Sequence, residues 1–275
     1  MAVNTPNAQY QLMRERWETM NDVCNGAPAI KLHPYKYLPY TQCDDDGKRF
    51  IQYAKRAVFY ETTKDTLQSH VGLAFSEDPS FEPDGMDFLK SNADGAGKSI
   101  YQLNQLALVG LLKHGRGGYL VDHPSVESGI SKAQAETMGL RPVIVHYDAL
   151  SIINWRVKKV GGEYRLSLVV LHEIENVVDP QDEFQEKAVN VYRVLRLDEN
   201  NRYSVQVYSD KTGELIGSEL IYPTRQGGNW DIIPFIFLGS QVNDSNIHDI
   251  PLEPLANINL AHYRNSAEYE ESVFV

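Results

Sequence analysis

Residues 231–275 read DIIPFIFLGSQVNDSNIHDIPLEPLANINLAHYRNSAEYEESVFV, and the order of elements in this stretch decides the fold. Residues 232–238 predict a short apolar strand that is broken by a proline. After a polar loop, Pro251 and Pro254 indicate the first turn of a helix, where the amide hydrogen that proline lacks would have no intrahelical acceptor. No glycine, proline or basic last turn ends this helix, and the final three residues are apolar. We therefore expect the helix to continue in a longer protein.

The length and composition are those of a globular protein. The 275 residues can bury a core in one or two domains, and 42% apolar with 23% charged residues argues against disorder. The net charge of -11 argues against tight sequence-independent binding of nucleic acid, because such binding depends on Lys and Arg displacing counterions. This charge is compatible with DNA that passes nearby without being held.

The sequence predicts a cytoplasmic protein with no membrane association. Cys24 and Cys43 are too few for a disulfide scaffold and lack the spacing of a zinc site, so we expect reduced thiols. The first thirty residues contain no secretory signal. No apolar run approaches the roughly 18 residues of a membrane helix.

The first half of the chain is predicted to be helical. Apolar residues recur at helical spacing over residues 10–23, and residues 48–74 give the longest helical pattern, with a kink or break expected near Thr62 and Thr63. Between these helices, three prolines in residues 27–40 predict an extended arm or a covered loop. The acidic run 44–46 predicts a solvated turn and helix cap rather than a metal site.

The stretch Gly95-Ala96-Gly97-Lys98-Ser99 has two interpretations. It resembles the end of a phosphate-binding loop, but that motif requires a glycine where Asn92 stands and a buried strand before it. The alternative is a helix start, with Ser99 as N-cap and Gln102 completing a capping box. We favour the helix start, with the helix ending at the glycines that follow His114.

The second half is predicted to form an antiparallel sheet. Runs rich in Val, Ile, Leu and Tyr are separated by turn residues such as Gly161-Gly162 and Glu199-Asn200-Asn201. The expected strands are residues 119–121, 143–147, 152–157, 164–172, 189–197, 203–208 and 215–222. The fold class is therefore α+β: a helical N-terminal half, an antiparallel β meander and a long final helix.

The sequence contains no complete catalytic motif. His172-Glu173 opens a metalloprotease pattern, but Asn176 stands where the second histidine is required, and the segment is predicted as a strand. No nucleophile elbow, kinase loop or dinucleotide fingerprint occurs. We therefore expect no cofactor and no metal, and a structural or interaction protein instead of an enzyme.

Short segments in a fixed order run through nearly the whole chain. They are Cys24-Asn25-Gly26-Ala27 after a helix with Trp17, Tyr37-Leu38-Pro39, Arg56-Ala57-Val58-Phe59-Tyr60, Gly72-Leu73-Ala74-Phe75 with Asp78-Pro79, Asp94-Gly95, residues 115–122 and Ile153-Asn154-Trp155-Arg156. The most specific are Ile233-Pro234-Phe235-Ile236-Phe237-Leu238-Gly239 and Leu255-Ala256-Asn257-Ile258-Asn259-Leu260-Ala261-His262-Tyr263-Arg264. In this order the segments resemble a tailed-phage portal family that is described otherwise as a domain of unknown function.

The resemblance implies a structural subunit of a portal, a dodecameric ring at one capsid vertex that serves as the conduit for DNA packaging and ejection and as the head–tail connector. Implied partners are further copies of the chain, the capsid protein, the packaging terminase and the tail adaptor, while double-stranded DNA passes without tight binding. The implied locations are the virion and, during assembly, the host cytoplasm. The sequence departs from the family in one way, because everything after the first stem helix is missing.

The same resemblance divides the chain into an N-terminal helix and arm (1–45), a helical part of the wing (46–123), a β-rich part of the wing (124–249) and the start of the stem helix (250–275). An apolar stripe on that last helix is expected to contact neighbouring subunits. Its predicted interface residues are Leu255, Ile258, His262, Tyr263 and Tyr269. The spacing fits equally an amphipathic helix that packs on its own core.

Two other functions stay open from the sequence. The tyrosine-rich meander is compatible with a tail or receptor-binding module. The hypothesis of a nucleotide-binding enzyme depends only on the stretch from Gly95 to Ser99.

Overall fold

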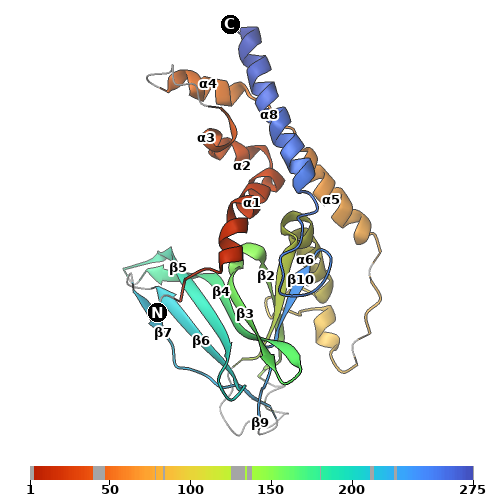
Figure 1. Cartoon of the computed structure of the whole chain (residues 1–275), viewed down its shortest axis with the longest axis vertical. Coiled ribbons are helices and arrows are strands. Elements are labelled where there is room, and N and C mark those ends of the chain that lie inside the picture. Colours follow the sequence, from red (N-terminus) through yellow and green to blue (C-terminus); the bar gives the residue numbers. More distant parts are fainter. Residues whose placement is uncertain are drawn as a thin grey trace.

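The structure is a computed structural model that describes residues 3–39, 47–77, 79–82, 84–124, 134, 138–179, 181–210, 214–225 and 228–274. Most helices gather at one end of the molecule and the sheets at the other, residues 87–114 pack beside the smaller sheet, and the C-terminal helix points away from the sheets (Figure 1). The α+β class predicted from the sequence is confirmed. The acidic turn at 44–46 and most of the polar segment 125–137 lie outside the described residues.

Before the first strand, the described residues form six α-helices and one short 3-10 helix. These elements are α1 (Ala8–Asn25), α2 (Ala27–Leu32), α3 (Pro34–Tyr37), α4 (Lys48–Arg56), α5 (Thr62–Ala74), η1 (Asp87–Lys90) and α6 (Ile100–His114). The predicted break in the long helical pattern is confirmed, since residues 57–61 separate α4 from α5. The capping box of Ser99 and Gln102 is present, and Gly115 ends α6 in the left-handed conformation with φ 69°.

The predicted extended arm at residues 27–40 is wrong over its described part, which forms α2 and α3. Prolines occupy the first turn of both helices, where they leave no hydrogen bond unmade. Gly26, with φ 89°, makes the sharp turn from α1 into α2. Three closely spaced prolines therefore divide the segment into short helices instead of extending it.

The larger sheet is the predicted meander. Its strands follow chain order from β3 (Ile152–Val160) through β4 (Glu163–Asp179), β5 (Asp182–Leu197) and β6 (Tyr203–Asp210) to β7 (Leu215–Gly217), and all neighbours are antiparallel. The sheet curls in Figure 1. Strands β4 and β5 are longer than predicted, because residues 174–188 are polar and largely exposed and give no apolar alternation.

The smaller sheet joins three segments that are distant in sequence. Its order is β10 (Phe235–Gly239), β1 (Arg116–Asp122) and β2 (Val143–Asp148), with η2 (Ala149–Ser151) leading from β2 into β3. The Ile-Pro strand predicted near the C-terminus is therefore the neighbour of the glycine-rich strand after α6, with Gly117 opposite Leu238. A two-stranded ribbon of β8 (Thr224–Arg225) and β9 (Gly228–Asn229) precedes β10, and helix α8 (Glu253–Phe274) follows it.

One hydrophobic cluster contains residues from all four ranges that the sequence divided. Trp17 of α1, Phe59 before α5, Val169 of β4 and Tyr263 of α8 belong to it. Trp17 is fully buried, and its indole Nε1 donates a hydrogen bond to the His114 carbonyl at 2.9 Å. The helices and both sheets are therefore packed through a shared core.

Replacing Gly118 by alanine is expected to lower the free energy of unfolding by about 2–3 kcal/mol, because the added methyl group overpacks the core. A Cβ at Gly118 would lie 2.2 Å from Cζ of Phe235. That ring is held by Phe237 at a centroid distance of 5.0 Å and by Tyr147 at 6.4 Å. Denaturant unfolding measures the change.

The matched control is Gly72→Ala in α5, where the added Cβ meets nothing within 4 Å apart from the backbone of its own helix and its two chain neighbours. We expect this variant to gain up to about 1 kcal/mol, since alanine is the better helix former. Equal effects of the two substitutions would contradict the packing argument.

Candidate functional site

Helix α8 is held to the body of the protein by one buried face. Ala256, Leu260, Tyr263 and Ala267 recur at helical spacing and are buried against elements that include α4, α5 and α1. The Tyr263 ring packs edge-to-face on Phe59, with centroids 5.5 Å apart. This face accounts for the docking of the helix.

On one side, Asn259 connects the base of α8 to the start of α5. Its side-chain oxygen accepts hydrogen bonds from the amide and the hydroxyl of Thr63 at 3.2 and 3.0 Å, and its side-chain nitrogen donates to the Tyr60 carbonyl at 2.8 Å. Asn259 and Thr63 are both buried. A buried amide with these partners fixes the two helices in register.

On the other side, α8 contacts α3 and α4. Nε of Arg264 donates to the Tyr37 carbonyl at 3.0 Å, and Glu271 accepts hydrogen bonds from Arg49 and Arg56. Burial acts to raise the pKa of Glu271, but the two guanidinium groups outweigh it and hold the pKa below its usual value. Helix α8 therefore lies between α3 and α4 on one side and α5 on the other (Figure 1).

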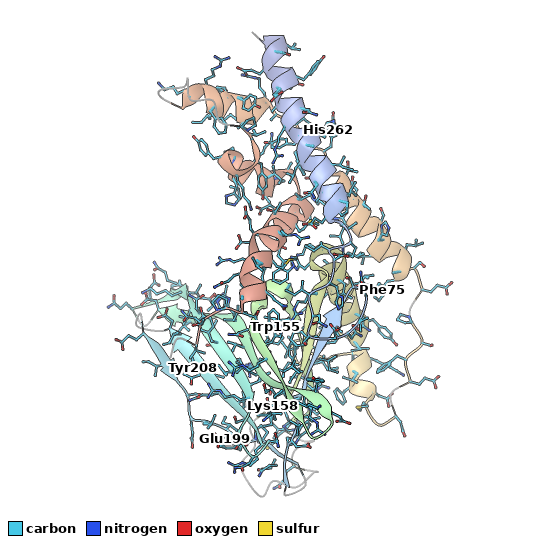
Figure 2. The ribbon with its side chains drawn as sticks, in the orientation of Figure 1. Phe75, Trp155, Lys158, Glu199, Tyr208 and His262 are labelled. Carbon is cyan, nitrogen blue, oxygen red and sulfur yellow. The ribbon has the colours of Figure 1, made fainter. Side chains whose placement is uncertain are left out.

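The second face of α8 is exposed and uncharged. At 100° per residue, its apolar and aromatic side chains fall within about 60° of one another around the helix. They are Leu255, Ile258, His262, Tyr269 and Val273. Ile258 and Tyr269 are 68% and 67% exposed, His262 (labelled in Figure 2) and Val273 are also exposed, and Leu255 at the base of the helix is half-buried. Every charged residue of α8 lies outside this sector.

A shallow pocket opens beside this face. It has a volume of about 220 Å³ and is lined by Tyr60, Thr62, Leu255, Ile258, Asn259 and His262. The rings of Tyr60 and His262 meet edge-to-face at 5.0 Å. The volume is below the roughly 300 Å³ at which small-molecule pockets begin, so the pocket suits a side chain of another molecule better than a cofactor.

The structure separates the five residues that the sequence grouped. Ile258, His262 and Tyr269 are exposed and Leu255 is half-buried on the same face, whereas Tyr263 is fully buried in the core about 100° away around the helix. Apolar spacing could not separate them because α8 has two apolar stripes. Sequence reasoning also missed Tyr60 and Thr62, which reach the pocket from another element.

The base of α8 is fixed at the turn between α6 and β1. The amide of Ser240 donates to the Gly115 carbonyl at 3.1 Å, and the amide of Leu252 donates to the Leu112 carbonyl at 3.2 Å. A Cβ at Gly115 would lie 2.5 Å from the Asp249 carbonyl oxygen, so the two backbones approach as closely as glycine permits. The exit direction of α8 is therefore set by residues about 130 positions earlier in the chain.

Arg116 holds the same loop from inside. Its Nη1 donates to the carbonyls of Ser245 and Asn246 at 3.1 and 2.9 Å, and its guanidinium lies 4.1 Å from the Trp155 ring and 4.2 Å from the Phe237 ring. Only 1% of Arg116 is exposed. Burial lowers the pKa of Arg116 to about 9, with Asp244 opposing the shift, so the group is charged at neutral pH.

A second polar cluster joins the two sheets. Glu173 of β4 accepts hydrogen bonds from the Tyr147 hydroxyl at 2.5 Å and from Nε of Arg193 at 2.7 Å, and Arg193 also pairs with Asp122 of β1 at 3.1 Å. Burial and the Glu173 carboxylate raise the pKa of Tyr147, so its hydroxyl stays protonated. The four side chains are one another's hydrogen-bond partners, and we assign the cluster a structural role.

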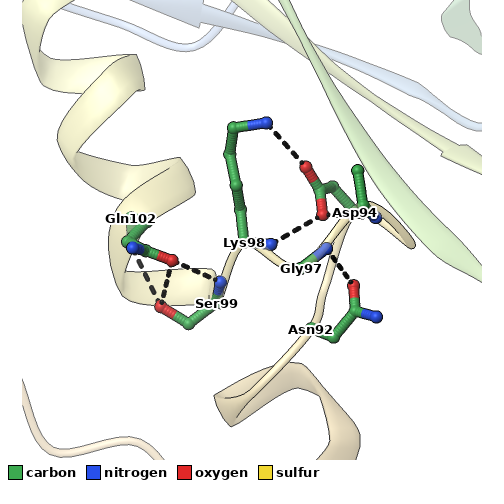
Figure 3. A network of polar contacts seen from close by, with 7 residues as sticks. Asn92, Asp94, Gly97, Lys98, Ser99 and Gln102 are labelled. Carbon is green, nitrogen blue, oxygen red and sulfur yellow. Dashed lines mark hydrogen bonds and ion pairs between the residues drawn. The ribbon is translucent and has the colours of Figure 1, made fainter.

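The glycine-rich loop before α6 is occupied by side chains of the protein itself. Asp94 accepts hydrogen bonds from the amides of Ala96 and Lys98 and from the Lys98 ammonium, and Asn92 accepts from the Gly97 amide (Figure 3). Burial acts to raise the pKa of Asp94, but these donors together hold it below the usual value. The amides that would bind a phosphate are therefore used internally.

From this geometry we expect no nucleotide to raise the melting temperature of the protein, since a ligand stabilises only the state that it binds. Thermal unfolding with and without ATP and Mg²⁺ measures the effect. A shift of several degrees that Lys98→Ala abolishes would contradict the assignment and restore the nucleotide hypothesis.

No group of three or more potential metal-ligating side chains converges within the described ranges. Over the same residues, no helix has both the length and the apolar content to cross a membrane.

No protein-family model matches the chain, and the search of curated proteins finds no match.

Proposed function

We propose that the protein is a subunit of a phage portal ring at the capsid vertex, where it contributes to the conduit for DNA and to the head–tail connection. The observation that supports this proposal most is the exposed, uncharged apolar face along α8. Contiguous apolar surface of this kind is typical of contacts between proteins. The order of a β-rich body, an Ile-Pro strand and a long helix agrees with the family that the sequence resembles.

The net charge of -11 also supports the proposal. A conduit must let DNA slide, and an acidic body repels the phosphate backbone instead of holding it. In this proposal the partners are further copies of the chain, the capsid protein, the terminase and the tail adaptor. The protein then acts by assembly and needs no cofactor, first in the host cytoplasm and then in the virion.

Electron microscopy and mass measurement of the full-length protein test the proposal, with closed rings as the expected result. The variant Ile258→Asp places a charge on the exposed face and should reduce assembly without unfolding the chain. Ile174→Asp on β4 is the matched control, because Ile174 is 66% exposed and lies in the larger sheet. A strict monomer at all concentrations, with no rings in virions, would exclude a portal role.

A tail or receptor-binding module is the second candidate. Tyr164 and Phe184 favour it, since they are 76% and 88% exposed near the two ends of β4. Exposed aromatic residues are common in recognition surfaces. Immunolabelling of virions separates the candidates, because a tail module would be found at the distal tail and a portal at the capsid vertex.

A further inference from the structure

Two arginines in one row of the larger sheet have side chains with no hydrogen-bond or ion-pair partner among the described residues. Arg156 of β3 lies opposite Leu168 of β4, and Leu168 lies opposite Arg196 of β5. Residues directly opposite one another in an antiparallel sheet share a face. Both arginine side chains therefore leave the same face, on strands about 10 Å apart with Leu168 between them.

This lack of partners is unusual in the chain. Every other arginine with a described side chain makes an ion pair, a hydrogen bond or a ring contact, as Arg165 and Arg193 do with carboxylates at 3.1 and 2.7 Å. Arg156 is exposed and Arg196 is half-buried. A half-buried charge without a counter-charge costs free energy, and an anion between the two guanidinium groups would offset that cost.

Carboxylates at this end of the larger sheet are bound to other groups. Glu163 and Asp231 pair with Arg165 at 3.3 and 3.1 Å. Asp198 accepts hydrogen bonds from two backbone amides of its own turn and from Nε of Arg202. These three carboxylates therefore do not neutralise the arginines of the row.

Lys158 adds positive charge beside the row. It lies two positions after Arg156 in β3, on the same face, and its Nζ donates to the Asp198 carbonyl at 3.1 Å. Figure 2 shows Lys158 at the same end of the sheet as Glu199, an exposed residue that forms no ion pair within the described ranges. The unpaired charges near the row are therefore mainly positive, although the chain carries -11 overall.

We propose that Arg156 and Arg196 together bind one phosphate group, of a free phosphate ion or of a nucleic-acid backbone. A guanidinium group donates two parallel hydrogen bonds to an oxyanion. One arginine can engage both oxygens of a carboxylate, whereas a phosphate group offers further oxygens to a second arginine. The site lies in the larger sheet and not on α8, so it is independent of the proposed function. A single site of this kind is compatible with an acidic body that does not hold DNA along its length.

Calorimetric titration with inorganic phosphate at constant ionic strength tests the site. The unmodified protein should bind phosphate saturably, and Arg156→Gln or Arg196→Gln should each weaken binding about tenfold. The matched control is Lys159→Gln, which removes the same charge from an exposed position on the opposite face of β3. This control should leave the affinity for phosphate nearly unchanged.

Lysine substitutions separate geometry from charge. Arg156→Lys with Arg196→Lys keeps both charges but removes the paired donors, so phosphate binding should still weaken. Thermal unfolding without phosphate should show little change in any of these variants, because the replaced side chains have no partner in the described part of the chain. Equal affinities of the double lysine variant and the unmodified protein would overturn the inference, since binding would then depend on charge alone.

A labelled single-stranded oligonucleotide identifies the source of the phosphate group. If the site binds a nucleic-acid backbone, inorganic phosphate should displace the oligonucleotide. The slope of log Kd against log salt concentration should then fall by about 0.7 when both arginines are replaced by glutamine. Binding of phosphate without the oligonucleotide would indicate the free ion as the ligand.

No binding of either probe, or equal binding after both arginines are replaced by glutamine, would overturn the inference. Ring formation by the same variants is measured separately, so the proposed function can fail without the phosphate site and the phosphate site without the proposed function.

Discussion

Replacing Arg116 by alanine is expected to lower the free energy of unfolding by about 3–5 kcal/mol. The substitution removes a side chain that fills the space between Trp155 and Phe237, and it leaves the carbonyls of Ser245 and Asn246 without their donor. The second loss concerns the loop that leads into α8. We therefore expect a destabilised chain whose α8 base also exchanges amide hydrogens faster.

Denaturant unfolding and hydrogen exchange measure these two effects. Arg14→Ala is the matched control, since Arg14 forms an exposed pair with Glu18 one turn along α1. Exposed pairs contribute about 0–1 kcal/mol, so the control should change little. If Arg116→Ala were no more destabilising than Arg14→Ala, the account of the buried guanidinium would be wrong.

Lowering the pH from 6.5 toward 5 is expected to destabilise the protein before most carboxylates titrate. The His114 ring is fully buried, with Nε2 3.0 Å from Oδ1 of Asn21 and no partner for Nδ1 among the described residues. Burial, together with the charge of Lys113, lowers the pKa of His114 to about 3, and Asp148 opposes the shift. Burial lowers the pKa of His146 in the same direction.

The direction in which stability changes with pH follows from proton binding. Between the folded pKa near 3 and the ordinary value near 6.5, the unfolded chain binds a proton that the folded chain does not. The contribution of each such group to the free energy of unfolding is therefore fully present above pH 6.5. It falls with decreasing pH by up to about 1.4 kcal/mol per pH unit.

Denaturant unfolding between pH 7 and 5 measures this slope. The His114→Gln variant should retain only the part of this slope that His146 contributes. The control variant His70→Gln, at an exposed position in α5, should keep the whole slope. A slope that is the same with and without His114 would reject the assignment.

The sequence predicted the elements whose signals are local. The capping box at Ser99, the glycine end of α6 and most strand positions of the meander follow from neighbouring residues and are confirmed. The strand predicted over residues 215–222 is wrong beyond Gly217, where only Ile221 forms an isolated bridge. The pairing of β10 with β1 was not predictable in this way, because it depends on contacts between segments more than 100 residues apart. The outer halves of β4 and β5 were missed since both of their faces are exposed.

The candidate site was predictable in part. Helical spacing placed Leu255, Ile258, His262 and Tyr269 on one helix, but only the position of Phe59 shows that Tyr263 belongs to the core.

The junction between β10 and α8 also determines how the protein would respond to mechanical force. Strand β10 pairs with β1 from Phe235 to Gly239, and both β10 and α8 run toward the same end of the molecule (Figure 1). A pull along α8 would therefore load the β10–β1 ladder in shear, so that its hydrogen bonds share the tension instead of breaking one after another. Arg116, in the first position of β1, would act as an anchor against slippage.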